Sequence, residues 1–187
     1  AEITYQSLWL KCHYPAEFTA ALLSNQPMGY YPPRVLVVDA RRFGVKILPL
    51  DVNESLDHYT VKDGAIRVSF RQLKGMSEEA LESILSERAK GEFTSLRDFI
   101  LRTNTSQPIT GNLIKIGAFD SFATRNNLLL ELPKFMNLKH KIAKGTKSLF
   151  EDIKPEPVPV TTVTYKNKKA KMLVERELLS LDLSAHP

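Results

Sequence analysis

Residues Leu73-Lys74-Gly75-Met76-Ser77-Glu78-Glu79-Ala80 decide the fold of this chain. A glycine among polar residues predicts a tight turn, because glycine adopts left-handed backbone conformations without steric cost. Ser77 is expected to cap the following helix, and Glu78 and Glu79 favour the positive end of that helix. Apolar residues then recur at helical spacing up to Gly91. The stretch therefore predicts two helical segments joined by a short hairpin.

This arrangement is typical of a helix-hairpin-helix that holds the phosphate backbone of DNA. Gly75 lets the main chain approach a phosphate, and the amides of Met76 and Ser77, where the second helix opens, donate to it. Lys74 adds positive charge, and such contacts do not depend on base sequence. An ordinary packing corner between two helices is an equally good interpretation, because the two glutamates after Ser77 repel a phosphate held nearby.

A second and weaker helix-Gly-helix unit follows. It consists of Leu113-Ile114-Lys115-Ile116-Gly117-Ala118-Phe119 and a helix expected over residues 125–132. Lys115 and Gly117 correspond to the lysine and glycine of the first turn, and Thr94 or Ser95 is expected to start a connecting helix. The repetition indicates a tandem module and favours DNA binding over the packing interpretation.

The rest of the chain predicts a mainly α fold with a small β-hairpin. Helical spacing recurs in three segments near the start, at residues 3–10, 18–23 and 34–43. Asp63-Gly64 predicts the turn of a hairpin within residues 58–68. Trp9 and the tyrosines beside it are expected to pack between helices rather than stack on bases. Residues 166–183 predict a final helix, which follows an extended, proline-rich linker.

The composition excludes several classes of protein. Of the 187 residues, 43% are hydrophobic and 25% are charged, which suits folded domains rather than a disordered tail. A single cysteine, Cys12, excludes an internal disulfide framework and a thiolate-rich zinc site. No stretch approaches the ~20 apolar residues needed to span a bilayer. A cytoplasmic location is therefore expected.

The formal net charge of +5 lies in the last third of the chain. Residues 1–70 carry 7 basic and 7 acidic side chains, and residues 71–133 carry 8 of each. Residues 134–187 carry 11 basic and 6 acidic side chains. The sharpest basic run extends from Lys134 to Lys147 and contains no acidic residue. This run either faces an anionic partner such as DNA or keeps a linker solvated.

No constellation of residues predicts catalysis or metal binding. The sequence has no Walker-type phosphate loop and no nucleophile elbow, and its four histidines are scattered without metal-ligand spacing. Asp51, Asp57 and Asp63 recur every six residues but are interpreted as turn and surface residues. The sequence therefore predicts no catalytic residue, no metal site and no bound cofactor.

The segment Thr146-Lys147-Ser148-Leu149-Phe150 lies between the basic run and the proline-rich linker. Two large apolar side chains in a polar segment are typical of a docking peptide that fills a pocket of a partner. From the residues alone, packing of Leu149 and Phe150 onto their own domain is the simpler interpretation.

Stretches along almost the whole chain resemble the bacterial C-family replicative DNA polymerases, that is, the DNA polymerase III alpha subunit. In chain order they are the stretch from Tyr5 to Phe18, the stretch from Leu36 to Asn53 with Asp39-Ala40-Arg41-Arg42 and Leu48-Pro49-Leu50-Asp51-Val52-Asn53, the stretch from Leu73 to Ala80, Gly91-Glu92-Phe93-Thr94-Ser95-Leu96 and Gly117-Ala118-Phe119-Asp120. The closing stretches Glu175-Arg176-Glu177-Leu178-Leu179 and Leu183-Ser184-Ala185-His186-Pro187 resemble the segment before that family's OB domain.

The resemblance implies four segments. Residues 1–70 correspond to the end of the fingers domain, and residues 71–133 to a tandem helix-hairpin-helix module that holds duplex DNA. Residues 134–165 correspond to a basic, proline-rich linker with a clamp motif, and residues 166–187 to a helix leading into an OB domain that is missing here.

The resemblance also implies partners: double-stranded DNA, the sliding clamp (the beta subunit) and other replisome subunits, with no membrane. The segment from Thr146 to Phe150 resembles the internal clamp-binding motif, which reverses the packing interpretation above. Two positions depart from the family pattern. Thr146 replaces the usual leading glutamine of the clamp motif, and Ser77 replaces the usual second glycine of the hairpin.

The family's catalytic carboxylates have no counterpart here and are expected upstream of Ala1. We therefore expect this chain to bind duplex DNA weakly and to polymerise nothing by itself, with Mg²⁺ required by the parent polymerase. The alternative is a non-catalytic helical scaffold for protein–protein contacts. A hairpin module of a repair nuclease or ligase is disfavoured by the end-to-end resemblance, and both a main replicase and an error-prone paralogue remain open.

Overall fold

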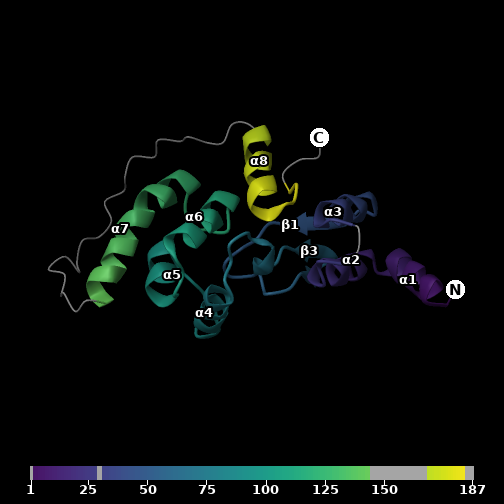
Figure 1. The fold of residues 1–187 in the computed structure, drawn as a ribbon, viewed down its shortest axis with the longest axis horizontal. Coiled ribbons are helices and arrows are strands. Elements are labelled where there is room, and N and C mark those ends of the chain that lie inside the picture. The colour runs from purple at the N-terminus through teal and green to yellow at the C-terminus, as the bar shows by residue number, and fades with distance from the viewer. Residues whose placement is uncertain (1, 29–30, 144–167, 184–187) are drawn as a thin grey trace. The chain divides into compact units, whose positions relative to one another are not determined.

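The structure is a computed structural model that describes residues 2–28, 31–143 and 168–183. Within these residues the chain forms eight α-helices, three short strands and one 3-10 helix (Figure 1). The predicted mainly α fold with a small sheet is therefore confirmed. The chain divides into two compact units: residues 1–74 with 167–187 form the first unit, and residues 75–166 form the second unit.

Prolines begin two of the three N-terminal helices of the first unit. Pro15 and Pro33 occupy the first turn of their helices, where the fixed φ angle suits the helix and the missing N–H has no helical partner to lose. The three helices are α1 (Glu2–His13), α2 (Pro15–Ser24) and α3 (Pro33–Arg42). Leu23 of α2 and Val37 of α3 are buried, whereas α1 buries none of its residues.

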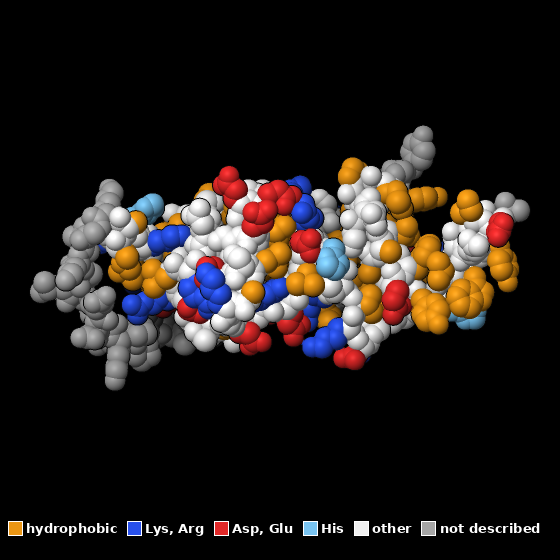
Figure 2. Space-filling model, turned by 90° about the horizontal axis from the view of Figure 1, so that it is seen from below, with side chains coloured by type: hydrophobic (Ala, Val, Ile, Leu, Met, Phe, Trp, Pro, Cys, Tyr) orange, Lys and Arg blue, Asp and Glu red, His pale blue; other side chains and the backbone are white. Residues whose placement is uncertain are grey.

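The apolar side chains of α1 lie on the surface, so the predicted packing of Trp9 between helices is wrong. Trp9 is 44% exposed, and its ring pairs with the rings of His13 and Tyr14, with centroids 4.5 and 5.9 Å away. Figure 2 shows orange side chains gathered over this helix. Helical spacing predicts the helix itself, but apolar residues on several sides of α1 do not define one buried face.

A three-stranded sheet completes the N-terminal part of the first unit. Strand β1 (Lys46–Leu48) runs parallel to β3 (Ala65–Arg67), and β3 pairs antiparallel with β2 (Thr60–Lys62), so the order is β1-β3-β2. Asp63 and Gly64 join β2 to β3 with φ angles of 52° and 71°. Positive φ at both central residues is typical of a two-residue hairpin turn, and the predicted hairpin is confirmed.

The helix near the C-terminus packs back onto the first unit. Helix α8 (Lys168–Leu179) ends in a buried segment, in which Leu179 and Leu181 are 0% exposed. The Lys74 N–H donates to the Leu178 carbonyl oxygen at 2.9 Å, and the Gln72 side-chain amide donates to the Leu179 carbonyl oxygen at 2.5 Å. Residues far apart in sequence therefore meet where the chain leaves the first unit.

Serine caps begin the first two helices of the second unit: Ser77 as predicted, and Ser95 of the two predicted candidates Thr94 and Ser95. The helices are α4 (Glu78–Ala89), α5 (Leu96–Arg102), α6 (Gln107–Ile116) and α7 (Arg125–Ala143). The Ser77 hydroxyl accepts a hydrogen bond from the Ala80 N–H, and the Ser95 hydroxyl accepts one from the Asp98 N–H, each at 3.2 Å. These bonds satisfy N–H groups that have no partner within the helix.

A row of phenylalanine rings forms the centre of the second unit. Phe99 meets the edges of Phe93 and Phe119, with ring centroids 5.0 and 4.9 Å apart. All three side chains are almost completely buried. Edge-to-face pairs of this kind add to the stabilisation that comes from burial alone.

Helix α7 continues through Pro133, where the sequence suggested that a linker begins. Proline removes one main-chain hydrogen bond, but Leu132 and Met136 on either side are buried and hold both turns against the unit. Residues 134–143 are therefore helical. The basic residues in this part of the chain belong to a helix surface.

Candidate nucleic-acid interface

The first predicted hairpin is an exposed turn that precedes α4. The element before the turn was expected to be an α-helix, but it is a single 3-10 turn, η1 (Phe70–Gln72). Only two residues separate β3 from Phe70, and Leu73 is already buried in an extended conformation. There is room for one helical turn and no more.

Gly75 is the open point of this turn. Its φ angle is +81°, and a β-carbon at this position would meet no atom within 4 Å. Lys74, Gly75 and Ser77 are exposed, and Met76 is half-buried. Within the described part of the chain, the Gly75 and Met76 N–H groups donate no hydrogen bond. Two amide donors are therefore available at a surface that an anion can reach.

The charge around the first hairpin is mixed. The amino end of α4 carries a partial positive charge, and Glu78 and Glu79 in its first turn already partly neutralise that charge. Lys74 is exposed, and no ion pair involves it among the described residues. An anion at this turn would meet the main-chain amides and Lys74, but also two exposed carboxylates.

The second predicted hairpin is closed by its own side chains. Gly117 ends α6 with φ +91°, and its N–H donates to the Ile114 carbonyl oxygen at 3.0 Å. The Arg125 guanidinium lies over Gly117 and binds both carboxylate oxygens of Asp120, at 2.8 and 2.6 Å. A β-carbon on Gly117 would come within 2.0 Å of Arg125 and 2.5 Å of Asp120. Gly117 is therefore buried beneath an ion pair.

Lys115 remains at the surface beside this closed turn. Its side chain is exposed, while its carbonyl oxygen accepts a hydrogen bond from Arg125 at 2.8 Å. Of the six residues predicted to contact DNA, Lys74, Gly75 and Ser77 are exposed in the first turn, and Lys115 is exposed in the second. The position of the Arg125 side chain over Gly117 was not predicted from the sequence, because the spacing of residues along the chain does not indicate this contact.

The five residues predicted to bind the clamp, from Thr146 to Phe150, lie outside the described residues.

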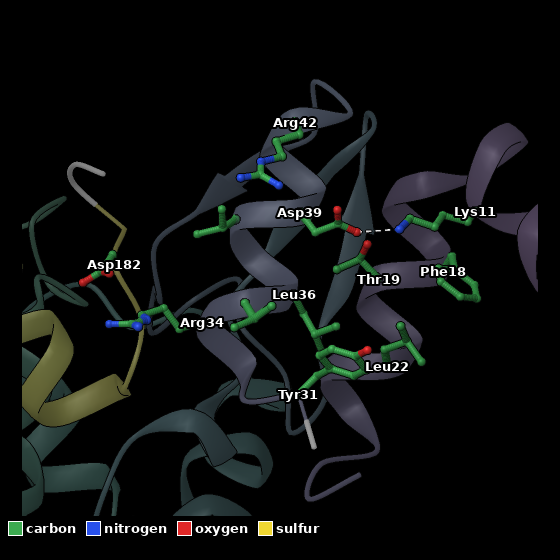
Figure 3. A pocket seen from close by; sticks show the side chains of 12 residues that line it. Lys11, Phe18, Thr19, Leu22, Tyr31, Arg34, Leu36, Asp39, Arg42 and Asp182 are labelled. Carbon is green, nitrogen blue, oxygen red and sulfur yellow. Dashed lines mark ion pairs between the residues drawn. The ribbon is translucent and has the colours of Figure 1, made fainter. Parts of the chain in front are cut away.

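A pocket of about 670 Å³ lies in the first unit (Figure 3). Apolar side chains of α2 and α3 line it, together with Tyr31, Arg34 and Arg42. Both carboxylates that line the pocket form ion pairs with basic side chains: Asp39 pairs with Lys11 at 2.7 Å, and Asp182 pairs with Arg176 at 3.0 Å. The pocket therefore offers no free carboxylate pair for a metal ion.

No group of three or more His, Cys, Asp or Glu side chains within the described ranges is arranged to hold a metal ion. None of the described helices is long and apolar enough to cross a membrane.

Comparison with known proteins agrees with the hairpin geometry. Residues 44–128 match the model of the helix-hairpin-helix motif. The chain is 32% identical to a DNA polymerase III subunit alpha of Deinococcus radiodurans, over 99% of this chain and 15% of the relative. It is 40% identical to an error-prone DNA polymerase of Symbiobacterium thermophilum, over 64% of this chain and 13% of the relative.

A third relative, an error-prone DNA polymerase of Teredinibacter turnerae, is 30% identical over 100% of this chain and 18% of its own length. The chain thus spans less than a fifth of the length of these three relatives. Its relatives therefore include both DNA polymerase III alpha subunits and error-prone DNA polymerases.

Proposed function

The chain belongs to the family of error-prone DNA polymerases and DNA polymerase III alpha subunits, and on this basis we propose that its helix-hairpin-helix region binds the phosphate backbone of duplex DNA without sequence preference. The observation that carries the proposal is the open turn at Gly75. At this turn, next to the capped end of α4, the Gly75 and Met76 N–H groups donate no hydrogen bond to any described residue. Gly75 has free space above it, and Lys74 is exposed. Backbone amides and lysines bind phosphate but do not read bases.

Replacing Lys74 and Lys115 by alanine is expected to weaken duplex binding and its salt dependence. Log K falls as log salt concentration rises, and each lysine that neutralises a phosphate makes this slope steeper by about 0.9. The slope of the double variant should therefore be shallower by about 1.8. The measurement is fluorescence anisotropy of a labelled duplex at several salt concentrations. Both side chains are exposed, so the fold should be retained.

The control for this pair is Lys62→Ala, which removes an exposed lysine on β2. It should leave the slope unchanged. Equal slopes for the wild type and the Lys74/Lys115 variant would contradict the assignment of these lysines. A wild type that binds no duplex at all would exclude DNA binding and favour the protein–protein scaffold.

We also propose that the segment from Thr146 to Phe150 binds a bacterial sliding clamp, through insertion of Leu149 and Phe150 into an apolar pocket of the clamp. The support is the pair of large apolar residues in a polar sequence, at the place where the family motif occurs. Thr146 cannot donate the amide hydrogen bonds of the usual glutamine, so the affinity should be lower than that of a motif with glutamine.

Changing both Leu149 and Phe150 to alanine should abolish retention of the full chain on immobilised bacterial clamp, because the two anchoring side chains are lost. The control is Ile153→Ala, which removes an apolar residue just after the motif. The immobilised clamp should retain this variant as well as it retains the wild type. Unchanged retention of the double variant would show that these residues are not the anchor.

In this proposal the chain is the DNA- and clamp-holding part of a cytoplasmic DNA-directed DNA polymerase, a nucleotidyltransferase that acts in replication with other replisome subunits. The residues described here bind and orient DNA and need no cofactor for that. The catalytic carboxylates and the Mg²⁺ they hold would belong to another part of the polymerase.

A further inference from the structure

Charge is separated within the second unit. Residues 78–92, which include α4, contain five acidic and two basic side chains. Residues 125–143, which form α7, contain four basic side chains and one acidic side chain. The charge that attracts a polyanion is therefore greater on α7 than on the segment that follows the first hairpin.

Two of the four cations of α7 are already engaged. Arg125 binds Asp120 over Gly117. The half-buried Lys139 donates to the Thr103 carbonyl oxygen at 2.6 Å, and burial lowers the pKa of this lysine. Lys134 and Lys141 are exposed, and neither has an ion-pair or hydrogen-bond partner among the described residues.

Lys134 and Lys141 lie on one face of the helix. They are seven residues apart, two helical turns, which places them about 10 Å apart along the axis. Leu130 and Asn137 are exposed on the same face, opposite the buried Leu132 and Met136. We call the exposed residues Leu130, Lys134, Asn137 and Lys141 the α7 face. On the side seen in Figure 2, Lys and Arg side chains lie at the end of the second unit that α7 forms.

We infer that the α7 face is a second phosphate-binding surface for duplex DNA, in addition to the hairpins. This inference rests on the proposed binding of DNA by the region. Successive phosphates of one strand rise about 3.4 Å along a duplex, so two lysines 10 Å apart span about three phosphates. In this inference the hairpin amides position the phosphate backbone of the DNA, and the α7 lysines add positive charge that no acidic side chain of the described residues neutralises.

The test is the double variant Lys134→Ala/Lys141→Ala of the full chain, titrated with a labelled 20-base-pair duplex at several salt concentrations. Loss of two phosphate contacts should make the slope of log K against log salt concentration shallower by about 1.8. It should also weaken binding up to about sixty-fold at 0.1 M salt. Lys134→Arg/Lys141→Arg keeps both charges and should keep the wild-type slope.

The matched control is Lys62→Ala/Lys90→Ala, which lowers the net charge by the same amount from β2 and the end of α4. Its slope should equal that of the wild type. Thermal unfolding by circular dichroism checks that every variant is folded.

The inference is overturned if the α7 double variant keeps the wild-type slope while the wild type binds DNA. It is also overturned if the control pair loses as much slope as the α7 pair, because the effect is then one of net charge. A wild type that binds no duplex at any salt concentration overturns both this inference and the proposed function.

Discussion

Truncating Phe99 to alanine is expected to lower the free energy of unfolding of the second unit by about 3–5 kcal/mol. Phe99 is 0% exposed and lies between Phe93 and Phe119 in the row of rings. Its removal leaves a cavity and ends both edge-to-face contacts. A domain of this size has a total stability of roughly 5–10 kcal/mol, so much of it should be lost.

Urea denaturation followed by far-ultraviolet circular dichroism measures this loss. Leu130→Ala is the control, because Leu130 is 68% exposed and its removal should change the stability by less than about 0.5 kcal/mol. A Phe99 variant as stable as the Leu130 variant would show that the rings are not the core of the unit.

Replacing Gly117 by alanine is expected to lower the stability of the same unit by about 2–4 kcal/mol. A left-handed conformation costs an L-residue about 1–2 kcal/mol. The new methyl group would also overlap the Arg125 guanidinium, so the bidentate pair with Asp120 has to break or move. The expected loss is the sum of strain and of a displaced charge-assisted pair.

Gly75→Ala is the control for this prediction, because Gly75 has a similar φ angle of +81° but open space above it. It should show the conformational cost alone, about 1–2 kcal/mol. The difference between the two variants in urea denaturation isolates the contribution of the pair over Gly117. If Gly117→Ala is no more destabilising than Gly75→Ala, Arg125 does not close the second hairpin.

Features that a few adjacent residues determine were predicted from the sequence. Ser77 and Ser95 begin their helices because a serine hydroxyl can accept a hydrogen bond from an N–H three residues on. Asp63-Gly64 forms its turn because both residues tolerate positive φ. In each case the physical cause lies within one helical turn or one hairpin of the signal.

Features that depend on distant contacts were not predicted. The course of α7 through Pro133 depends on burial of Leu132 and Met136, and proline alone suggests a break. The closure of Gly117 depends on where the Arg125 guanidinium lies once α7 has packed on α6. The two hairpins look alike in sequence, yet one is open and the other is covered.

The hydrogen bond between the Lys74 N–H and the Leu178 carbonyl oxygen has a consequence for the order of folding. Docking of α8 closes a loop of about 100 residues, which costs about 4 kcal/mol of chain entropy before any contact is gained. The hairpin of β2 and β3 and the helices of the second unit close much shorter loops and should form first. On the ribosome, the site that receives Leu179 and Leu181 therefore stays open to water until the second unit has emerged.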